Sequence, residues 1–253
     1  MAKHSHWDNI KHKKAANDKK KGAVIAKMGK LITVAVQAGG GVLGDNPRLR
    51  LAVDKARSAG MSMEVIERAI KKAAGLGSDG KTMEEVTYEG YAKGGVAVVI
   101  TGLTDNRTRT APEIKKLFEY AGGSMGIPGC VSWQFKDKAV FLADKTTEDA
   151  VMEALLAANA DAEDIAPQEG GQVAITAAPN QYDAVIKALA AAKIAVVSQG
   201  FTKLPDNGIP VTDAAIAAAV HELIDSLDDH DDIQDVYHNA EFAEGLAERS
   251  ASG

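Results

Sequence analysis

Apolar residues recur at helical spacing through the first third of the chain. Ile25, Met28, Ile32 and Ala35 lie on one face of a predicted helix, which ends at the glycines of residues 39–41. Two further helices are predicted after it. One begins at Pro47 with Asn46 as its N-cap, and the other begins after Ser62. The glycine-rich stretch of residues 75–80 then reads as a linker, so the pattern predicts a small three-helix domain.

From residue 84 the pattern changes to short strands bounded by glycines and charged turns. The segments VTYEGYA and GVAVVITGL are predicted as strands, and CVSWQF as a third. Between them, Thr110 and Glu113 have the spacing of a capping box, and Pro112 fits the first turn of a helix. A later helix, TDAAIAAAVHELIDSL, and a strand, IQDVYHN, would complete the same α/β unit.

Residues 138–204 have a βαββαβ order of their own, which is that of the ferredoxin-like split motif. We therefore expect this segment to be inserted into the preceding α/β unit. The predicted class is α/β (α+β), with a three-helix domain and two ferredoxin-like α/β domains, one inserted in the other. The expected boundaries are 1–80 for the basic helical domain, 81–136 plus 205–240 for the discontinuous domain, 137–204 for the insertion, and 241–253 for a frayed tail.

Composition adds limits to this picture. The chain has 253 residues, of which 45% are hydrophobic and 25% charged, and no apolar segment approaches the roughly 20 residues that span a bilayer. Cys130 is the only cysteine, so no intramolecular disulfide forms. The basic start lacks the apolar run of a secretory signal and the arginines of a mitochondrial presequence. We expect a cytoplasmic protein with no membrane partner, and a monomer.

The charge is distributed unevenly. Residues 1–77 hold 16 Lys and Arg against 6 Asp and Glu; because the whole chain has 29 basic and 35 acidic side chains, the remainder holds 13 and 29. A basic first third joined to an acidic remainder indicates a polyanionic partner for one end.

Clustered cations bind nucleic acids because each neutralised phosphate releases condensed counterions. The alternative is an ordinary solvated helix surface, although such surfaces usually mix signs. No motif for reading base sequence accompanies the cations. The predicted nucleic-acid-binding residues of the first domain are Lys11, Lys13, Lys14, Lys19, Lys20, Lys21, Lys27, Lys30, Arg48, Arg50, Lys55 and Arg57.

A second candidate is the segment LTDNRTRTAPE, in which Arg107 and Arg109 precede the predicted helix start. Two arginines near free helix N–H groups favour a phosphate or carboxylate site. A loop ion-paired to the acidic remainder accounts for them equally well. Both alternatives stay open at this point.

Other motifs carry weaker signals. Gly39, Gly41 and Gly44 match G-x-G-x-x-G but follow a helix, the histidines of the first 12 residues lack a metal-binding pattern, and Cys130 lacks a catalytic context. The acidic run of residues 228–232 is interpreted as a solvated turn. Tyr88 and Tyr91 are candidates for base stacking, although packing is the commoner role. No catalytic residue, metal or cofactor is predicted, so the chain is not expected to be an enzyme.

Four long segments resemble the YebC/PmpR family: MAKHSHWDNIKHKKAANDKKKG, GGGVLGDNPRLRLAVDKARSAGMSMEVIERAIKKAAG, TYEGYAKGGVAVVITGLTDNRTRT and DDIQDVYHN. The resemblance covers nearly the whole chain and implies three domains. It also implies regulation of gene expression, because members are described as DNA-binding transcriptional regulators. Others act in translation, including a mitochondrial activator and bacterial members linked to ribosomes stalled on proline-rich sequences. One departure is His6, where members often carry Lys.

Two functions are therefore expected. The first is a DNA-binding transcriptional regulator. The alternative is a ribosome-associated translation factor that binds ribosomal RNA through the same cations. A phosphate-binding surface serves either function, so the sequence leaves DNA and ribosomal RNA, with the ribosome, as candidate partners.

Overall fold

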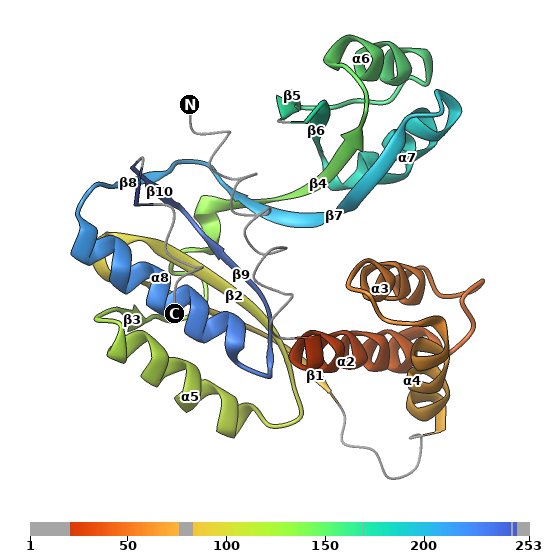
Figure 1. Ribbon diagram of the computed structural model, residues 1–253. Helices are drawn as coiled ribbons and strands as arrows, with labels where there is room; N and C mark the ends of the chain where they lie inside the picture. The colour runs from red at the N-terminus through yellow and green to blue at the C-terminus, as the bar shows by residue number, and fades with distance from the viewer. Residues whose placement is uncertain (1–20, 76–82, 169, 244, 247–253) are drawn as a thin grey trace. The chain divides into compact units, whose positions relative to one another are not determined.

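The computed structural model describes residues 21–75, 83–168, 170–243 and 245–246 (Figure 1). The chain divides into two compact units. Unit 1 comprises residues 1–133 and 207–253, and unit 2 comprises residues 134–206.

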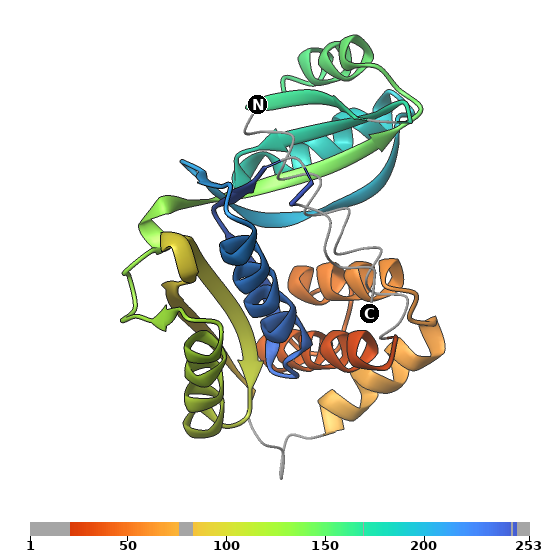
Figure 2. The same ribbon diagram turned by 60° about the vertical axis from the view of Figure 1, so that its left-hand side comes forward.

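The first described segment of unit 1 is a helical bundle made of α2 (Lys21–Gly39), α3 (Pro47–Ser58) and α4 (Met63–Gly75) (Figures 1 and 2). Ile32, Leu49 and Ile66 are fully buried at its centre. Asn46 is the N-cap of α3, as predicted, and its side-chain oxygen accepts from the Leu49 N–H at 3.0 Å. Its amide nitrogen also donates to the Ala35 carbonyl at 2.7 Å, so one buried side chain joins the end of α2 to the start of α3.

The remainder of unit 1 is a two-layer α/β domain. Its antiparallel sheet has the order β3-β1-β2-β9. Two helices, α5 and α8, cover one face, where Ile114, Phe118 and Leu223 pack against Ile100 of the sheet. The elements are β1 (Glu84–Tyr91), β2 (Ala97–Thr104), α5 (Arg107–Tyr120), β3 (Ser124–Met125), β8 (Ile209–Val211), α8 (Ala214–Asp229), β9 (Ile233–His238) and β10 (Ala240–Phe242), with β8 and β10 paired in parallel.

Unit 2 is a four-stranded antiparallel sheet of order β5-β6-β4-β7 with two helices on one face. Phe141, Ile175 and Leu189 lie in its core. This order, together with the βαββαβ sequence, is ferredoxin-like. The elements are β4 (Phe135–Asp144), α6 (Glu148–Ala157), β5 (Asp164–Gln168), β6 (Gln172–Ala177), α7 (Tyr182–Ala191) and β7 (Ala195–Pro205). The predicted α+β class is confirmed.

Three local predictions were wrong. The segment CVSWQF is not a strand: residues 132–134 form a 3-10 turn, and β3 occupies the edge of the sheet instead. The N–H groups of Gly129, Val131 and Ser132 are taken by the Glu89 carboxylate at 2.8 to 2.9 Å, so they are not available to a sheet. The tail predicted for residues 241–253 is not wholly irregular, because its first residues belong to strand β10. The capping box predicted at Thr110 and Glu113 does not start helix α5, which begins at Arg107 with Asn106 as its N-cap.

Gly102 of β2 lies close against the loop before β9. An added Cβ would lie 2.5 Å from the Asp232 carbonyl oxygen. Because backbone cannot yield as a side-chain tip does, Gly102→Ala should lower the free energy of unfolding of unit 1 by about 2 kcal/mol. Gly44→Ala is the matched control, since nothing lies within 4 Å of that site. Equal thermal unfolding curves for the two variants would contradict this assignment.

Candidate nucleic-acid interface

Helix α3 divides its side chains among three faces. Leu49, Ala52, Val53 and Ala56 are buried in the bundle core. Because seven residues make almost two helical turns, Arg48 and Lys55 lie together on one side of this core stripe, and Arg50 and Arg57 lie together on the other side. The predicted cations of α3 therefore form two separate faces.

The face with Arg50 and Arg57 is exposed. Arg50 donates through Nη1 to the carbonyls of Leu43 and Gly44 at 2.7 and 2.8 Å, which fixes the guanidinium beside the α2–α3 loop. Arg57 has no side-chain partner among the described residues. These two arginines therefore lie on the solvent-exposed side of α3.

The face with Arg48 and Lys55 has carboxylate partners from the α/β domain of unit 1. Arg48 pairs with Glu85 of β1. Lys55 lies 3.3 Å from Asp235 of β9. All four side chains remain at least one third exposed, so each pair contributes about 0–1 kcal/mol to stability.

Lys27 and Lys30 of α2, one helical turn apart, meet the last turn of α8 and the segment that follows it. Lys27 donates to the Asp228 carbonyl at 2.5 Å. Lys30 donates to the Asp231 carbonyl at 3.0 Å and to the Asp232 carboxylate at 2.7 Å. Lys27 and Lys30 are therefore in contact with acidic residues of the same chain.

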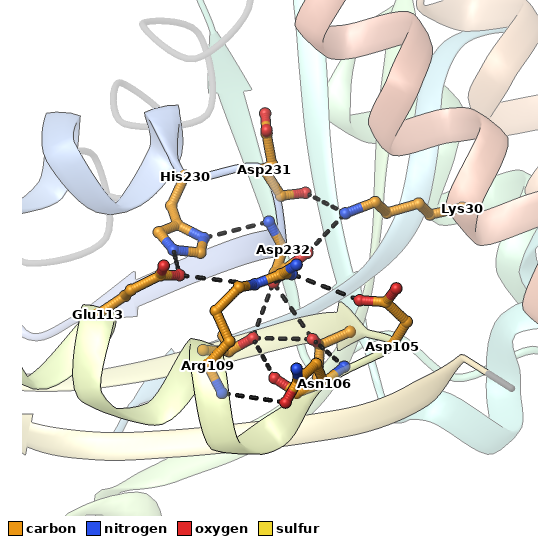
Figure 3. Close-up of polar contacts among 10 residues, drawn as sticks. Lys30, Asp105, Asn106, Arg109, Glu113, His230, Asp231 and Asp232 are labelled. Atoms are coloured by element: carbon orange, nitrogen blue, oxygen red, sulfur yellow. Dashed lines mark hydrogen bonds and ion pairs between the residues drawn. The ribbon is translucent and has the colours of Figure 1, made fainter. Parts of the chain in front are cut away.

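Asp232 is the centre of this contact (Figure 3). Its side chain is only 3% exposed. One carboxylate oxygen accepts from Lys30, and the other accepts from Arg109 at 2.5 Å and from the Thr110 hydroxyl at 2.7 Å. The Asp232 carbonyl accepts from the Leu103 N–H at 2.7 Å. A single buried carboxylate thus joins α2, α5 and the start of β9.

These partners decide the charge state of Asp232. Burial alone raises the pKa of a carboxyl, because the charged form loses hydration. Hydrogen bonds from Lys30, Thr110 and Arg109 outweigh this, and the pKa of Asp232 lies well below its ordinary value. Asp232 is therefore ionised across the physiological range.

Arg107 and Arg109 lie within the first turn of α5, not before it. Arg107 pairs with Glu84 at 3.3 Å, whereas Arg109 pairs with Asp232 and lies 3.5 Å from Asp105. Cations are unfavourable at a helix N-terminus, and these carboxylates offset that effect. The arrangement is the second of the two alternatives that the sequence left open, a segment ion-paired to the acidic remainder.

An open cleft of about 780 Å³ lies beside the Asp232 cluster. His230 borders it and contacts Glu113 at 3.1 Å through Nε2. The lining mixes both signs of charge, including Lys30, Arg109 and Lys116 with Asp105, Asp229 and Asp231. Among the described residues there is no group of three or more His, Cys, Asp or Glu side chains that could hold a metal ion.

The remaining predicted cations are not described in detail. Lys11, Lys13, Lys14, Lys19 and Lys20 lie outside the described residues, and Lys21 is the first residue of α2. Exposed cations are also present on α4, where Lys71 and Lys72 have no side-chain partner in the described part of the chain.

Sequence reasoning missed Asp232. The run of residues 228–232 was interpreted as a solvated turn, and this is wrong for Asp232, which is buried. Asp232 immediately precedes the apolar strand residue Ile233, and this position was the available signal that the last acid of the run enters the core.

The two tyrosines differ in exposure. Tyr88 is half-buried against the α/β core, and burial raises its pKa. Tyr91 is exposed at 37%, and its hydroxyl donates to the Cys130 carbonyl at 3.3 Å. Stacking on bases therefore stays a hypothesis for Tyr91.

Models of known protein families match most of the chain. Residues 5–76 match the model of the TACO1/YebC protein N-terminal domain, and residues 83–240 match that of the TACO1/YebC second and third domain. The chain belongs to the TACO1/YebC family. This confirms the resemblance seen in the sequence.

TACO1/YebC relatives cover the chain from end to end. A protein of Chromohalobacter salexigens is 42% identical over 97% of this chain and 98% of its own length, and one of Desulfotalea psychrophila is 43% identical over 99% and 100%. Both are named "probable transcriptional regulatory protein". A conserved hypothetical protein of Aquifex aeolicus, solved by crystallography, has a TM-score of 0.80 at 35% identity, covering 92% of this chain and 95% of that one. Within the described residues, no helix combines the length and apolar character needed to cross a membrane.

Proposed function

We propose that this TACO1/YebC protein is a non-enzymatic regulator of gene expression that binds nucleic acid through its helical bundle. The observation that carries the proposal is the exposed arginine pair of α3, Arg50 and Arg57, on a segment where cations outnumber acids 16 to 6. Their phosphate contacts would position the bundle on a backbone without reading bases. The names of the relatives favour DNA and transcription.

Ribosomal RNA is the second candidate. The sequence holds no zinc-finger, basic-zipper or RNA-recognition motif, and aromatic residues make up only 5% of the chain. A surface that binds phosphates without reading bases suits a target recognised by its shape, as structured RNA is. In this alternative the protein acts in translation.

The proposal predicts a loss of binding when the outward arginines are removed. Arg50→Gln combined with Arg57→Gln should weaken binding by roughly tenfold or more near physiological salt. It should also reduce the slope of log affinity against log salt by about 2, because two phosphate contacts are lost. Fluorescence anisotropy with a mixed-sequence DNA duplex and with a ribosomal RNA fragment measures both quantities.

The matched control is Lys145→Gln combined with Lys187→Gln, which removes two exposed cations of unit 2. Its affinity should stay within about twofold of the unaltered chain. Equal losses in both double variants would indicate a general charge effect and reject the arginine pair as a site. Tighter binding to DNA supports the transcriptional function, and tighter binding to RNA supports the translational one.

A further inference from the structure

We infer that Lys27, Lys30, Arg48 and Lys55 form a second phosphate-binding face, here called the covered face, which the chain's own acidic residues occupy until a polyanion displaces them. The covering residues are Glu85 and the segment of residues 228–235. This inference rests on the proposed function and adds a second face and its regulation. Its partner is a polyanion with closely spaced anionic groups, such as a sugar-phosphate backbone.

The covering groups resemble a phosphate backbone in their chemistry. Every cation of the covered face meets oxygen: Lys27 meets a carbonyl, Lys30 a carbonyl and a carboxylate, and Arg48 and Lys55 one carboxylate each. A phosphate presents the same kind of charged acceptor, and both guanidinium and ammonium groups bind it. The four side chains are thus already arranged for a row of anionic oxygens.

The helical bundle and the α/β domain of unit 1, which meet at a junction made by the covered face and its covering residues, have separate apolar cores. The apolar cluster of the helical bundle draws all of its members from residues 24–73, and the cluster of the α/β domain draws its own from residues 88–246. No described side chain belongs to both. The Arg48–Glu85 and Lys55–Asp235 pairs are exposed, so they are weak and are screened by salt, and no shared apolar cluster holds the two parts together.

Separating Lys30 from Asp232 does not leave a buried charge without hydrogen-bond partners. When Lys30 leaves, the Asp232 carboxylate still accepts from Arg109 at 2.5 Å, from Thr110 at 2.7 Å and from Thr104 at 3.2 Å. The large penalty for an unpaired buried carboxylate is therefore avoided. Lys30, which is 28% exposed, can turn to an incoming phosphate.

A polyanion has an advantage over the acidic segment. Each of the four cations that moves to a phosphate releases a condensed counterion into solution, whereas carboxylates on a protein surface hold no comparable atmosphere. The covering segment therefore competes with anions for these four cations. A polyanion displaces the segment, whereas a single anion does not. A polyanion would therefore bind with full affinity only when the covering residues separate from the covered face.

A zero-length carbodiimide cross-linker tests the uncovering in the full-length chain. It should join Lys55 to Asp235, since these side chains lie 3.3 Å apart, and mass spectrometry identifies the joined peptides. Saturating heparin, or saturating duplex DNA, should lower the yield at least fivefold. The internal reference is the Lys138–Glu163 pair within unit 2, whose yield should not change.

Affinity provides the second measurement. Glu85→Gln combined with Asp235→Asn removes two covering carboxylates and should tighten heparin binding by about three- to tenfold, because two weak competing pairs are lost. Glu64→Gln combined with Glu119→Gln is the matched control. It makes the same change of charge, but its acids pair with Arg68 and Lys115 of their own helices. The control should tighten binding by less than twofold.

The outcomes separate the inference from the proposed function. A Lys55–Asp235 yield that persists under saturating heparin, or equal gains in both double variants, overturns the covered face. If heparin releases the cross-link while neither DNA nor RNA binds, the covered face stands as a polyanion site and the proposed function fails.

Discussion

Asp232→Asn should lower the free energy of unfolding of unit 1 by about 3 kcal/mol at neutral pH. The carboxylate is buried and is held by Lys30, Arg109 and Thr110. Breaking such a cluster at its buried partner leaves cations facing an uncharged group, which typically costs about 3–5 kcal/mol. We place the loss at the lower end of this range, because Lys30 and Arg109 can each reach water.

The loss should depend on pH. Because the pKa of Asp232 is lower in the folded state than the roughly 3.9 of an unfolded chain, the native protein gains stability from ionised Asp232 above that value. This contribution is lost as the pH falls through about 4 toward the folded pKa. The difference in free energy of unfolding between the unaltered chain and Asp232→Asn should therefore have its full value above about pH 5 and should decrease on acidification.

Calorimetry across this pH range measures this difference in free energy of unfolding. Asp137→Asn is the control, since Asp137 is 68% exposed and its pair with Lys203 lies in unit 2. It should shift stability by less than about 0.5 kcal/mol. A pH-independent gap for Asp232→Asn would mean that the carboxylate is not the source of the stability.

Glu89→Ala should open the loop of residues 126–132 and lower the free energy of unfolding of unit 1 by about 3 kcal/mol. Glu89 is 6% exposed, and its two oxygens accept from the N–H groups of Gly129, Val131 and Ser132. Hydrogen bonds to a charged acceptor contribute about 1.5–3 kcal/mol each, and part of this returns when the loop meets water. Glu89→Gln keeps the shape and should lose less, because one amide oxygen remains an acceptor.

Hydrogen exchange locates the effect. The three loop amides should lose protection in both variants, whereas the amides of unit 2 should not change. Burial by itself raises the pKa of Glu89, but the three backbone donors outweigh it and lower the pKa. The loop should therefore also lose protection as the pH falls below about 4. Unchanged protection in Glu89→Ala would show that the turn holds the loop without the carboxylate.

Several elements could be predicted because their signals are local. Asn46 and Pro47 predicted the start of α3, since a cap acts on N–H groups within three residues. The alternating and helical patterns of residues 138–204 predicted the strands and helices of unit 2. The basic first third was visible from residue counts alone.

The errors share one cause. The segment CVSWQF has strand composition, yet Glu89, about 40 residues away in sequence, takes the N–H groups that a strand would need. For Arg107 and Arg109 the sequence left two alternatives open, because the carboxylates that pair with them come from other elements. A partner that is distant in the chain has no local signature.

The sequence by itself determined the family, the α+β class and the separation of charge between the first third and the rest, because these follow from residue types and their periodicity. The tertiary structure alone decided which cations meet the chain's own acids and which face outward. Arg48 and Arg50 are two positions apart and equally basic, but Arg48 pairs with Glu85, whereas Arg50 contacts only backbone carbonyls among the described residues. The difference arises because two residues on a helix differ by about 200° in direction, and only the fold places an acid on one of the two sides.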